Sequence, residues 1–151
     1  MHSFRFLVLN GPNLGALGDR QPEIYGNQTI DSLPDLVRQF LGKDADRIRL
    51  EFFQSNGEGH IIDRLEKARE EGIEGILLNA GAYTHTSLAI ADCLAWIGIP
   101  CIEVHLSNIL SRDPLRHTSL LARHCIGVIS GFGLMSYALA AQALLAHLEK
   151  K

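Results

Sequence analysis

The segment GILLNAGAYTHTSLAIADCLAWIGIPCIEVH, residues 75–105, has the pattern that is most informative about the fold. It begins with a short apolar run at 75–78, continues with a helical pattern at 86–96 and ends with a second apolar run at 101–104. Short apolar runs bounded by turn residues are typical of strands buried on both faces, as in parallel sheets. A strand, a helix and a strand in this order predict one right-handed crossover unit of a parallel sheet.

The same alternation continues on both sides of this unit. Further strands are predicted at residues 4–9, 48–53 and 126–129, further helices at 32–41, 60–71 and 134–148, and a loop with a short helix at 108–123. Five strands alternating with helices predict an α/β, flavodoxin-like, doubly wound parallel sheet with the strand order 2-1-3-4-5. A length of 151 residues, 46% of them hydrophobic, fits a single domain over residues 1–151.

Composition limits the function classes that fit the chain. The net charge of −3 leaves no basic face for nucleic acid, so a small-molecule partner is expected. Three cysteines without CxxC spacing, and no cleavable signal at the amino terminus, predict a reducing cytoplasm. Residues 125–148 contain no Asp, Glu, Lys or Arg, but Gly131 and Gly133 divide them into a strand and a helix, so no membrane span is predicted.

Polar residues follow the predicted strands at the points where the strands end. The first strand leads into residues 10–13, the second into 54–56 and the third into 79–81, while the fourth carries Glu103, His105 and Ser107. Ordinary turn chemistry explains any single asparagine among them. Because parallel sheets bind ligands beyond the carboxyl ends of their strands, their convergence at this edge predicts a ligand site.

Two pairs of residues have the chemistry of acids and bases. Glu103 and His105 are two apart on a strand, so they share one face, and a carboxylate beside an imidazole favours its protonated, acidic form. The connection over residues 12–27 is long enough to be a lid, and it contains Arg20 and Tyr25. A guanidinium beside a phenol favours phenolate, a base. The alternatives are a structural His–Glu pair, a tyrosine that packs the loop and a solvated arginine.

Other groups at this edge have the character of ligand contacts. His85 and Asp92 are seven residues apart, so they can face the same side. Ser107 and nearby backbone N–H groups suit a carboxylate, as do Arg112 and Arg116, although either arginine could instead be solvated. No metal site is expected, because the histidines lack HxxH or HExxH spacing and CxxC is absent; phosphate-binding glycine motifs are also absent.

Several long segments, in the right order, resemble the type II 3-dehydroquinate dehydratases over nearly the full chain. The matching segments are LNGPNLGALGDRQPEIYG at 9–26, QSNGEGHIID at 54–63, LLNAGAYTHTS at 77–87, IEVHLSN at 102–108, SRDPLRHTS at 111–119 and GVISGFG at 127–133. The resemblance implies dehydration of 3-dehydroquinate to 3-dehydroshikimate without a cofactor. It also implies a dodecamer built as a tetramer of trimers.

The resemblance also implies a role for each matching residue. Tyr25 matches the base, with Arg20 lowering its pKa, and His105 the acid, tuned by Glu103; Asn13 matches the residue that holds a water on the enolate intermediate. The implied substrate contacts are Asn79, His85, Asp92, Leu106 and Ser107 (the last two through backbone N–H), Arg116 and Arg112. A flavin- or nucleotide-binding module and an inactive assembly subunit are the competing hypotheses. Aromatic biosynthesis is the default role, and quinate breakdown remains open.

Overall fold

The computed structural model describes residues 2–16 and 29–151. Within them, five parallel strands form one sheet in the order β2-β1-β3-β4-β5, which confirms the predicted fold class. The strands are β1 (Phe4–Asn10), β2 (Ile48–Gln54), β3 (Gly75–Asn79), β4 (Cys101–His105) and β5 (Gly127–Ser130). The α-helices are α2 (Leu33–Leu41), α3 (Glu58–Glu70), α4 (Leu88–Ile97) and α5 (Met135–Glu149).

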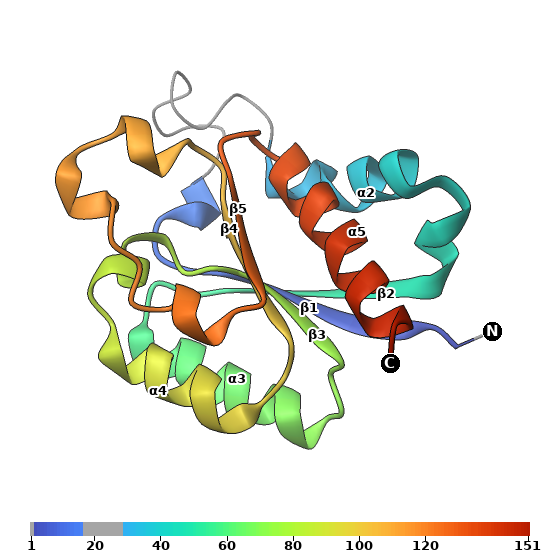
Figure 1. The fold of residues 1–151 in the computed structure, drawn as a ribbon, viewed down its shortest axis with the longest axis horizontal. Helices are drawn as coiled ribbons and strands as arrows, with labels where there is room; N and C mark the ends of the chain where they lie inside the picture. Colours follow the sequence, from blue (N-terminus) through green and yellow to red (C-terminus); the bar gives the residue numbers. More distant parts are fainter. Residues whose placement is uncertain (1, 17–28) are drawn as a thin grey trace.

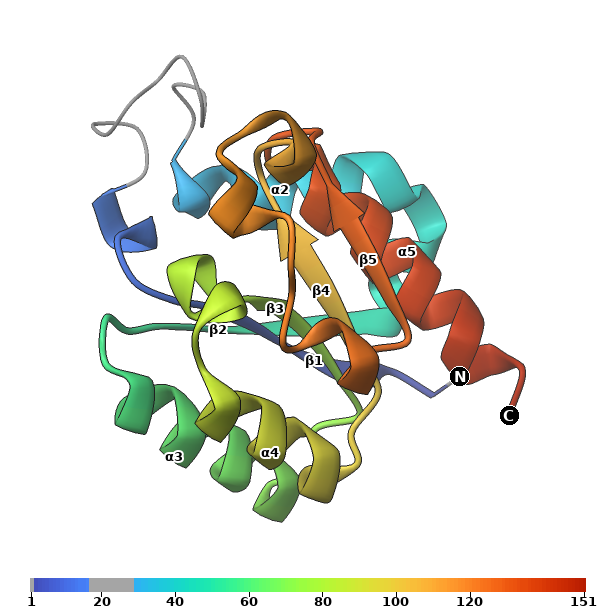
Figure 2. The ribbon, with the colours of Figure 1, turned by 60° about the vertical axis from the view of Figure 1, so that its left-hand side comes forward.

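Helices cover both faces of the sheet. Figures 1 and 2 show α2 and α5 together on one face and α3 and α4 on the other. Because successive strand residues point to opposite faces, Phe6 and Val8 of β1 join the core under α2 and α5, while Leu7 and Leu9 join the core above α3 and α4. All four are fully buried, so the sheet separates two apolar cores.

The charge-free segment near the carboxyl end is explained by the packing of α5. This helix crosses the middle of the sheet so closely that a Cβ on Gly75 would lie 2.5 Å from a methyl carbon of Leu144. Ala138, Ala140 and Ala141 are fully buried along the same helix. In the described part of the chain, none of the helices combines the length and apolarity of a membrane span.

Several element boundaries differ from the prediction by one or two residues. β1 to β4 each continue by one polar residue (Asn10, Gln54, Asn79 and His105), because ladder pairing uses the backbone and ignores side-chain polarity. α4 begins at Leu88 instead of residue 86, since Ser87 caps it by accepting the Ile90 N–H. Residues 108–123 contain three 3-10 helices, at Ile109–Ser111, Pro114–Arg116 and, starting in this segment, Ala122–His124.

Candidate active site

The polar ends of neighbouring strands meet at one edge of the sheet. Asn10 is directly opposite Gln54 on β2 and Asn79 on β3, and His105 ends β4 beside Ser130 of β5. A cavity of about 150 Å³ opens at this edge. Its lining includes eight of the predicted site residues: Asn13, Asn79, His85, His105, Leu106, Ser107, Arg112 and Arg116.

Glu103 and His105 form a buried pair on one face of β4. Glu103 Oε2 lies 2.7 Å from His105 Nε2, and the two residues are only 1% and 5% exposed. Since a carboxylate only accepts hydrogen bonds, Nε2 carries a proton, and His105 also lines the cavity. The contact holds the imidazole in one orientation on β4.

Ser119 completes this pair, although it was not predicted as a site residue. Its hydroxyl donates to Glu103 Oε1 at 2.5 Å and accepts the N–H groups of Leu121 and Ala122. Both carboxylate oxygens of Glu103 therefore have a donor despite their burial. Ser119 is 16 residues from Glu103 in sequence, and a serine in a polar segment carries no local signal of this contact.

His85 lies beside His105 with its ring fixed in orientation. The two rings are nearly parallel, with centroids 6.3 Å apart. His85 Nδ1 pairs with the Thr118 carbonyl at 2.8 Å; since a carbonyl only accepts, Nδ1 is the donor and Nε2 of a neutral ring is left as an acceptor. His85 thus presents a defined hydrogen-bonding edge to a ligand in the cavity.

The loops after β1 and β3 are locked together beside the cavity. The Gly11 N–H donates to the Asn79 carbonyl at 2.7 Å, and a Cβ on Gly11 would lie 2.5 Å from the Ala80 carbonyl oxygen. Asn13 follows in the left-handed region, at φ 69°, which asparagine tolerates. Its N–H donates to Asn56 Oδ1 at 3.0 Å, so its exposed side chain is held at the edge of the cavity.

Asn79 is held from two sides by hydrogen bonds. Its Oδ1 accepts the Gly81 N–H at 3.2 Å, and its Nδ2 donates to the Tyr137 hydroxyl at 3.0 Å. Tyr137 in turn donates to Asn10 Oδ1 at 2.5 Å. Tyr137 was not predicted as a site residue, although a tyrosine within a charge-free, buried helix signals a hydroxyl that needs a partner.

Two arginines bring positive charge to a chain whose net charge is −3. Arg112 Nη1 lies 3.4 Å from Ser107 Oγ, and Arg116 Nε donates to Asp113 Oδ2 at 3.0 Å. Arg112 directly follows the 3-10 helix Ile109–Ser111 and Arg116 ends the 3-10 helix Pro114–Arg116, and both residues line the cavity. This side of the cavity suits a carboxylate.

Of the remaining predicted site residues, one is described away from the cavity and two lie outside the described residues. Asp92 lies on the exposed face of α4 and is not among the residues that line the cavity. Arg20 and Tyr25 lie outside the described residues. Among the residues that are described, no group of three His, Cys, Asp or Glu side chains is close enough to hold a metal ion.

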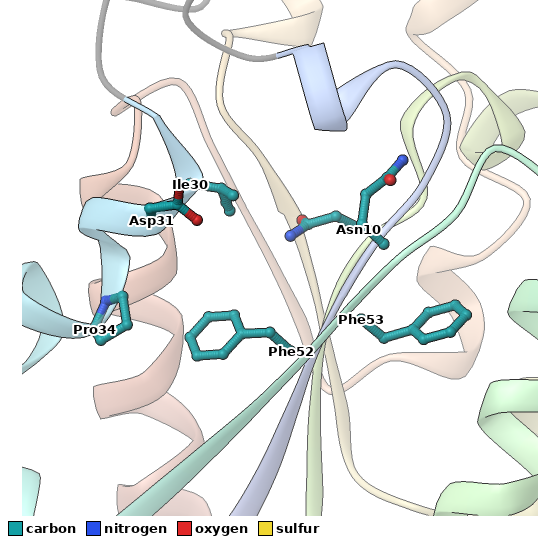
Figure 3. A pocket seen from close by; sticks show the side chains of 7 residues that line it. Asn10, Ile30, Asp31, Pro34, Phe52 and Phe53 are labelled. Atoms are coloured by element: carbon teal, nitrogen blue, oxygen red, sulfur yellow. The ribbon is translucent and has the colours of Figure 1, made fainter.

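A larger cavity, of about 280 Å³, lies between the carboxyl ends of β1 and β2 and the start of α2. Figure 3 shows Phe52 directed toward Pro34 in this cavity, while Phe53 points to the other side of the sheet. Its described lining is mainly apolar, with Asn10, Asp31 and Gln54 as the polar members. Because it has no described imidazole or arginine, it lacks the acid and the cations found in the smaller cavity.

Comparison with known proteins places this chain in a family. The model of the family described as dehydroquinase class II matches residues 4–145. The chain belongs to this family. Since it is a family of enzymes, the match confirms the prediction of an enzyme that acts on a small molecule.

Individual relatives agree with the family match. The 3-dehydroquinate dehydratase of Parasynechococcus marenigrum (strain WH8102) is 51% identical over 144 residues, covering 95% of this chain and 97% of that protein. The crystal structure of type II dehydroquinase from Butyrivibrio crossotus DSM 2876 has a TM-score of 0.87 at 43% identity, covering 94% of this chain and 97% of that one. The type II dehydroquinase structure from Propionibacterium acnes has a TM-score of 0.85 at 38% identity, with coverages of 95% and 97%.

Proposed function

We propose that this protein removes water from 3-dehydroquinate to give 3-dehydroshikimate, by anti elimination through an enolate intermediate. One observation carries the proposal: the buried Glu103–His105 pair faces a cavity that also contains Asn79 and two arginines. Elimination from a hydroxyketone needs an acid for the departing hydroxyl and contacts for a carboxylate, and this cavity provides both types of group. The relatives named 3-dehydroquinate dehydratase support the same reaction.

In the proposed mechanism, His105 is the general acid. It donates a proton to the departing hydroxyl as the carbon–oxygen bond breaks, and the electrons of the enolate re-form the ketone, so water is the leaving group. Glu103 stabilises the protonated imidazole through the 2.7 Å contact, and Ser119 holds the carboxylate in place. Hydroxide is a poor leaving group, so this proton is required for the step.

The base is proposed to be Tyr25, with Arg20 lowering its pKa. It takes the proton from the carbon beside the ketone, and the enolate that forms is stabilised by a water held by Asn13. The described residues of the cavity lining include neither a lysine nor a tyrosine, which supports a base from elsewhere in the chain and no Schiff-base route. The family resemblance, which covers the segment at 9–26, supports the assignment to Tyr25.

The remaining polar groups are proposed to bind the substrate. Asn79, His85 and the backbone N–H groups of Leu106 and Ser107 contact its oxygens, and Arg112 and Arg116 stabilise its carboxylate. Asp92 is exposed and away from the cavity of its own subunit, so a role in binding requires it to reach the cavity of a neighbouring subunit.

The assembly and the cellular role are part of the same proposal. The chain acts as a single-domain subunit of a dodecamer, a tetramer of trimers, in the cytoplasm and without a cofactor. Its default role is the shikimate pathway of aromatic amino-acid biosynthesis, and quinate breakdown uses the same reaction. Light scattering tests the assembly: the expected mass is twelve times that of the 16.6 kDa subunit.

An ultraviolet assay tests the reaction and its base together. Dehydration creates a conjugated enone, so absorbance is expected to rise when purified protein meets 3-dehydroquinate. Tyr25→Phe keeps the ring but removes the base, and kcat is expected to fall about 10²- to 10⁴-fold. Tyr83→Phe is the matched control and is expected to stay active, because the hydrogen bond that it removes among the described residues goes to the Asn56 carbonyl. An inactive wild type contradicts the function, and a fully active Tyr25→Phe contradicts the base.

A further inference from the structure

Tyr137 has a phenol hydroxyl deep inside the core. The residue is fully buried on α5, where its buried neighbours Ala138 and Ala141 are apolar. Burial raises the pKa of Tyr137 well above its usual value, so the hydroxyl keeps its proton and can both accept and donate a hydrogen bond. A hydroxyl in such a place is costly unless it is fully paired.

The hydroxyl is the middle of a directed chain of hydrogen bonds between two strand ends. Asn79 Nδ2 donates to Tyr137 Oη at 3.0 Å, and Tyr137 Oη donates to Asn10 Oδ1 at 2.5 Å. Asn79 ends β3 and Asn10 ends β1, and both are only 3% exposed. Hydrogen bonds that point in one direction polarise one another, so this row of hydrogen bonds is a rigid link between the two strand ends.

These hydrogen bonds, together with the Gly81 N–H, determine which way the Asn79 carboxamide faces. With Oδ1 on the Gly81 N–H and Nδ2 on Tyr137, every contact pairs a donor with an acceptor. A flipped amide would place Nδ2 against the Gly81 N–H, and Tyr137 could satisfy the turned Oδ1 only by leaving Asn10 without its donor. Within the described residues, the second N–H of Asn79 donates to no protein group, and Asn79 lines the cavity.

We infer that Tyr137 is a positioning residue, which acts through Asn79 to keep an N–H donor directed at an acceptor oxygen of the substrate. Asn10 is the far end of the link: its Oδ1 takes the Tyr137 proton. Although Asn10 also lines the larger cavity beside β2 (Figure 3), its role in this link is to hold Tyr137. The inference rests on the proposed function, because it assigns Asn79 to the bound substrate.

Tyr137→Phe tests the inference because it removes one oxygen and keeps the ring. Asn79 Nδ2 then loses its acceptor and the carboxamide is held by the Gly81 N–H alone, so KM for 3-dehydroquinate is expected to rise about tenfold, with kcat within about twofold. A merely structural role would act whether or not Asn79 is present. In an Asn79→Ala background, Tyr137→Phe is therefore expected to change kcat/KM by less than about twofold.

Each outcome decides the matter. Wild-type protein without dehydratase activity overturns the proposed function and this inference with it. Active wild type with an unchanged KM in Tyr137→Phe, or a tenfold effect that persists in the Asn79→Ala background, overturns the inference alone. If Tyr137→Phe does not fold, Asn10→Ala takes its place: without its acceptor, Tyr137 can donate to a flipped Asn79, and KM is expected to rise about threefold, but not in the Asn79→Ala background.

Discussion

Glu51 and Glu103 are both glutamates on strands of the same sheet, and each pairs with a basic side chain, but their surroundings differ. Glu51, on the edge strand β2, contacts Arg5 at 2.8 Å and Arg64 at 3.8 Å, and its side chain is 30% exposed. Glu103, on the inner strand β4, contacts His105 at 2.7 Å and is 1% exposed. Water screens the first pair and is excluded from the second.

The comparison distinguishes a glutamate that forms a surface ion pair from one that can take part in the reaction. An ion pair at the surface adds little to stability and tolerates change, since water replaces the lost partner. A buried carboxylate is costly to keep, so each of its oxygens needs a donor, and here His105 and Ser119 provide them. At the edge of the cavity, the buried pair is placed to act on a ligand.

The largest effect is expected for His105→Ala. It removes the proposed acid, so hydroxide would have to leave without a proton, and kcat is expected to fall about 10²- to 10⁴-fold. The ultraviolet assay measures the loss, and a thermal melt checks that the variant folds. A kcat within threefold of the wild type would contradict the proposed difference between the two glutamates, because the Glu103–His105 pair would then have no role in the reaction.

The next effect is expected for Glu103→Gln, which keeps the shape of the side chain and removes its charge. The protonated imidazole loses its stabilising neighbour, and kcat is expected to fall about 10- to 100-fold. Because one of the two buried donors, His105 Nε2–H or the Ser119 hydroxyl, then faces an amide N–H, the free energy of unfolding is expected to fall by about 1–3 kcal/mol. Denaturant unfolding together with steady-state rates measures both; a loss of activity explained by unfolding contradicts the expectation.

Ser119→Ala is expected to have a smaller effect on the rate than Glu103→Gln and a similar effect on stability. It leaves Glu103 Oε1 buried without its donor, which costs about 1–3 kcal/mol of unfolding free energy, and kcat is expected to fall about tenfold. Ser119→Thr keeps the hydroxyl and is expected to recover most of the activity. Equal rates for the alanine and threonine variants would show that the hydroxyl does not act on Glu103.

The smallest effect is expected for Glu51→Gln, the matched control for Glu103→Gln. Arg5, the partner of Glu51, also donates to the Glu71 carbonyl at 2.6 Å, so Arg5 keeps this hydrogen bond in the variant. The unfolding free energy is expected to fall by less than about 1 kcal/mol, less still at high salt, with kcat/KM unchanged. A large loss of activity here would show that charge anywhere on the sheet affects the reaction.

Local patterns predicted the fold and part of the site. Apolar runs gave the five strands, and the spacing of two between Glu103 and His105 predicted their shared face on β4. Ser119 and Tyr137 were not predicted, because they reach Glu103 and Asn79 across 16 and 58 residues, and no periodicity reports such distances. The exposed position of Asp92 also depends on how α4 packs, which the spacing from His85 could not determine.

Deuterium exchange in His105→Ala tests the central claim most directly, because it separates the base step from the acid step. With 3-dehydroquinate in heavy water, the variant is expected to exchange the proton beside the ketone, followed by NMR or mass spectrometry, while dehydration falls at least about 100-fold. That result assigns His105 to the departing hydroxyl. Loss of exchange and dehydration to the same extent would contradict the account, since His105 would then serve the whole reaction and not its acid step.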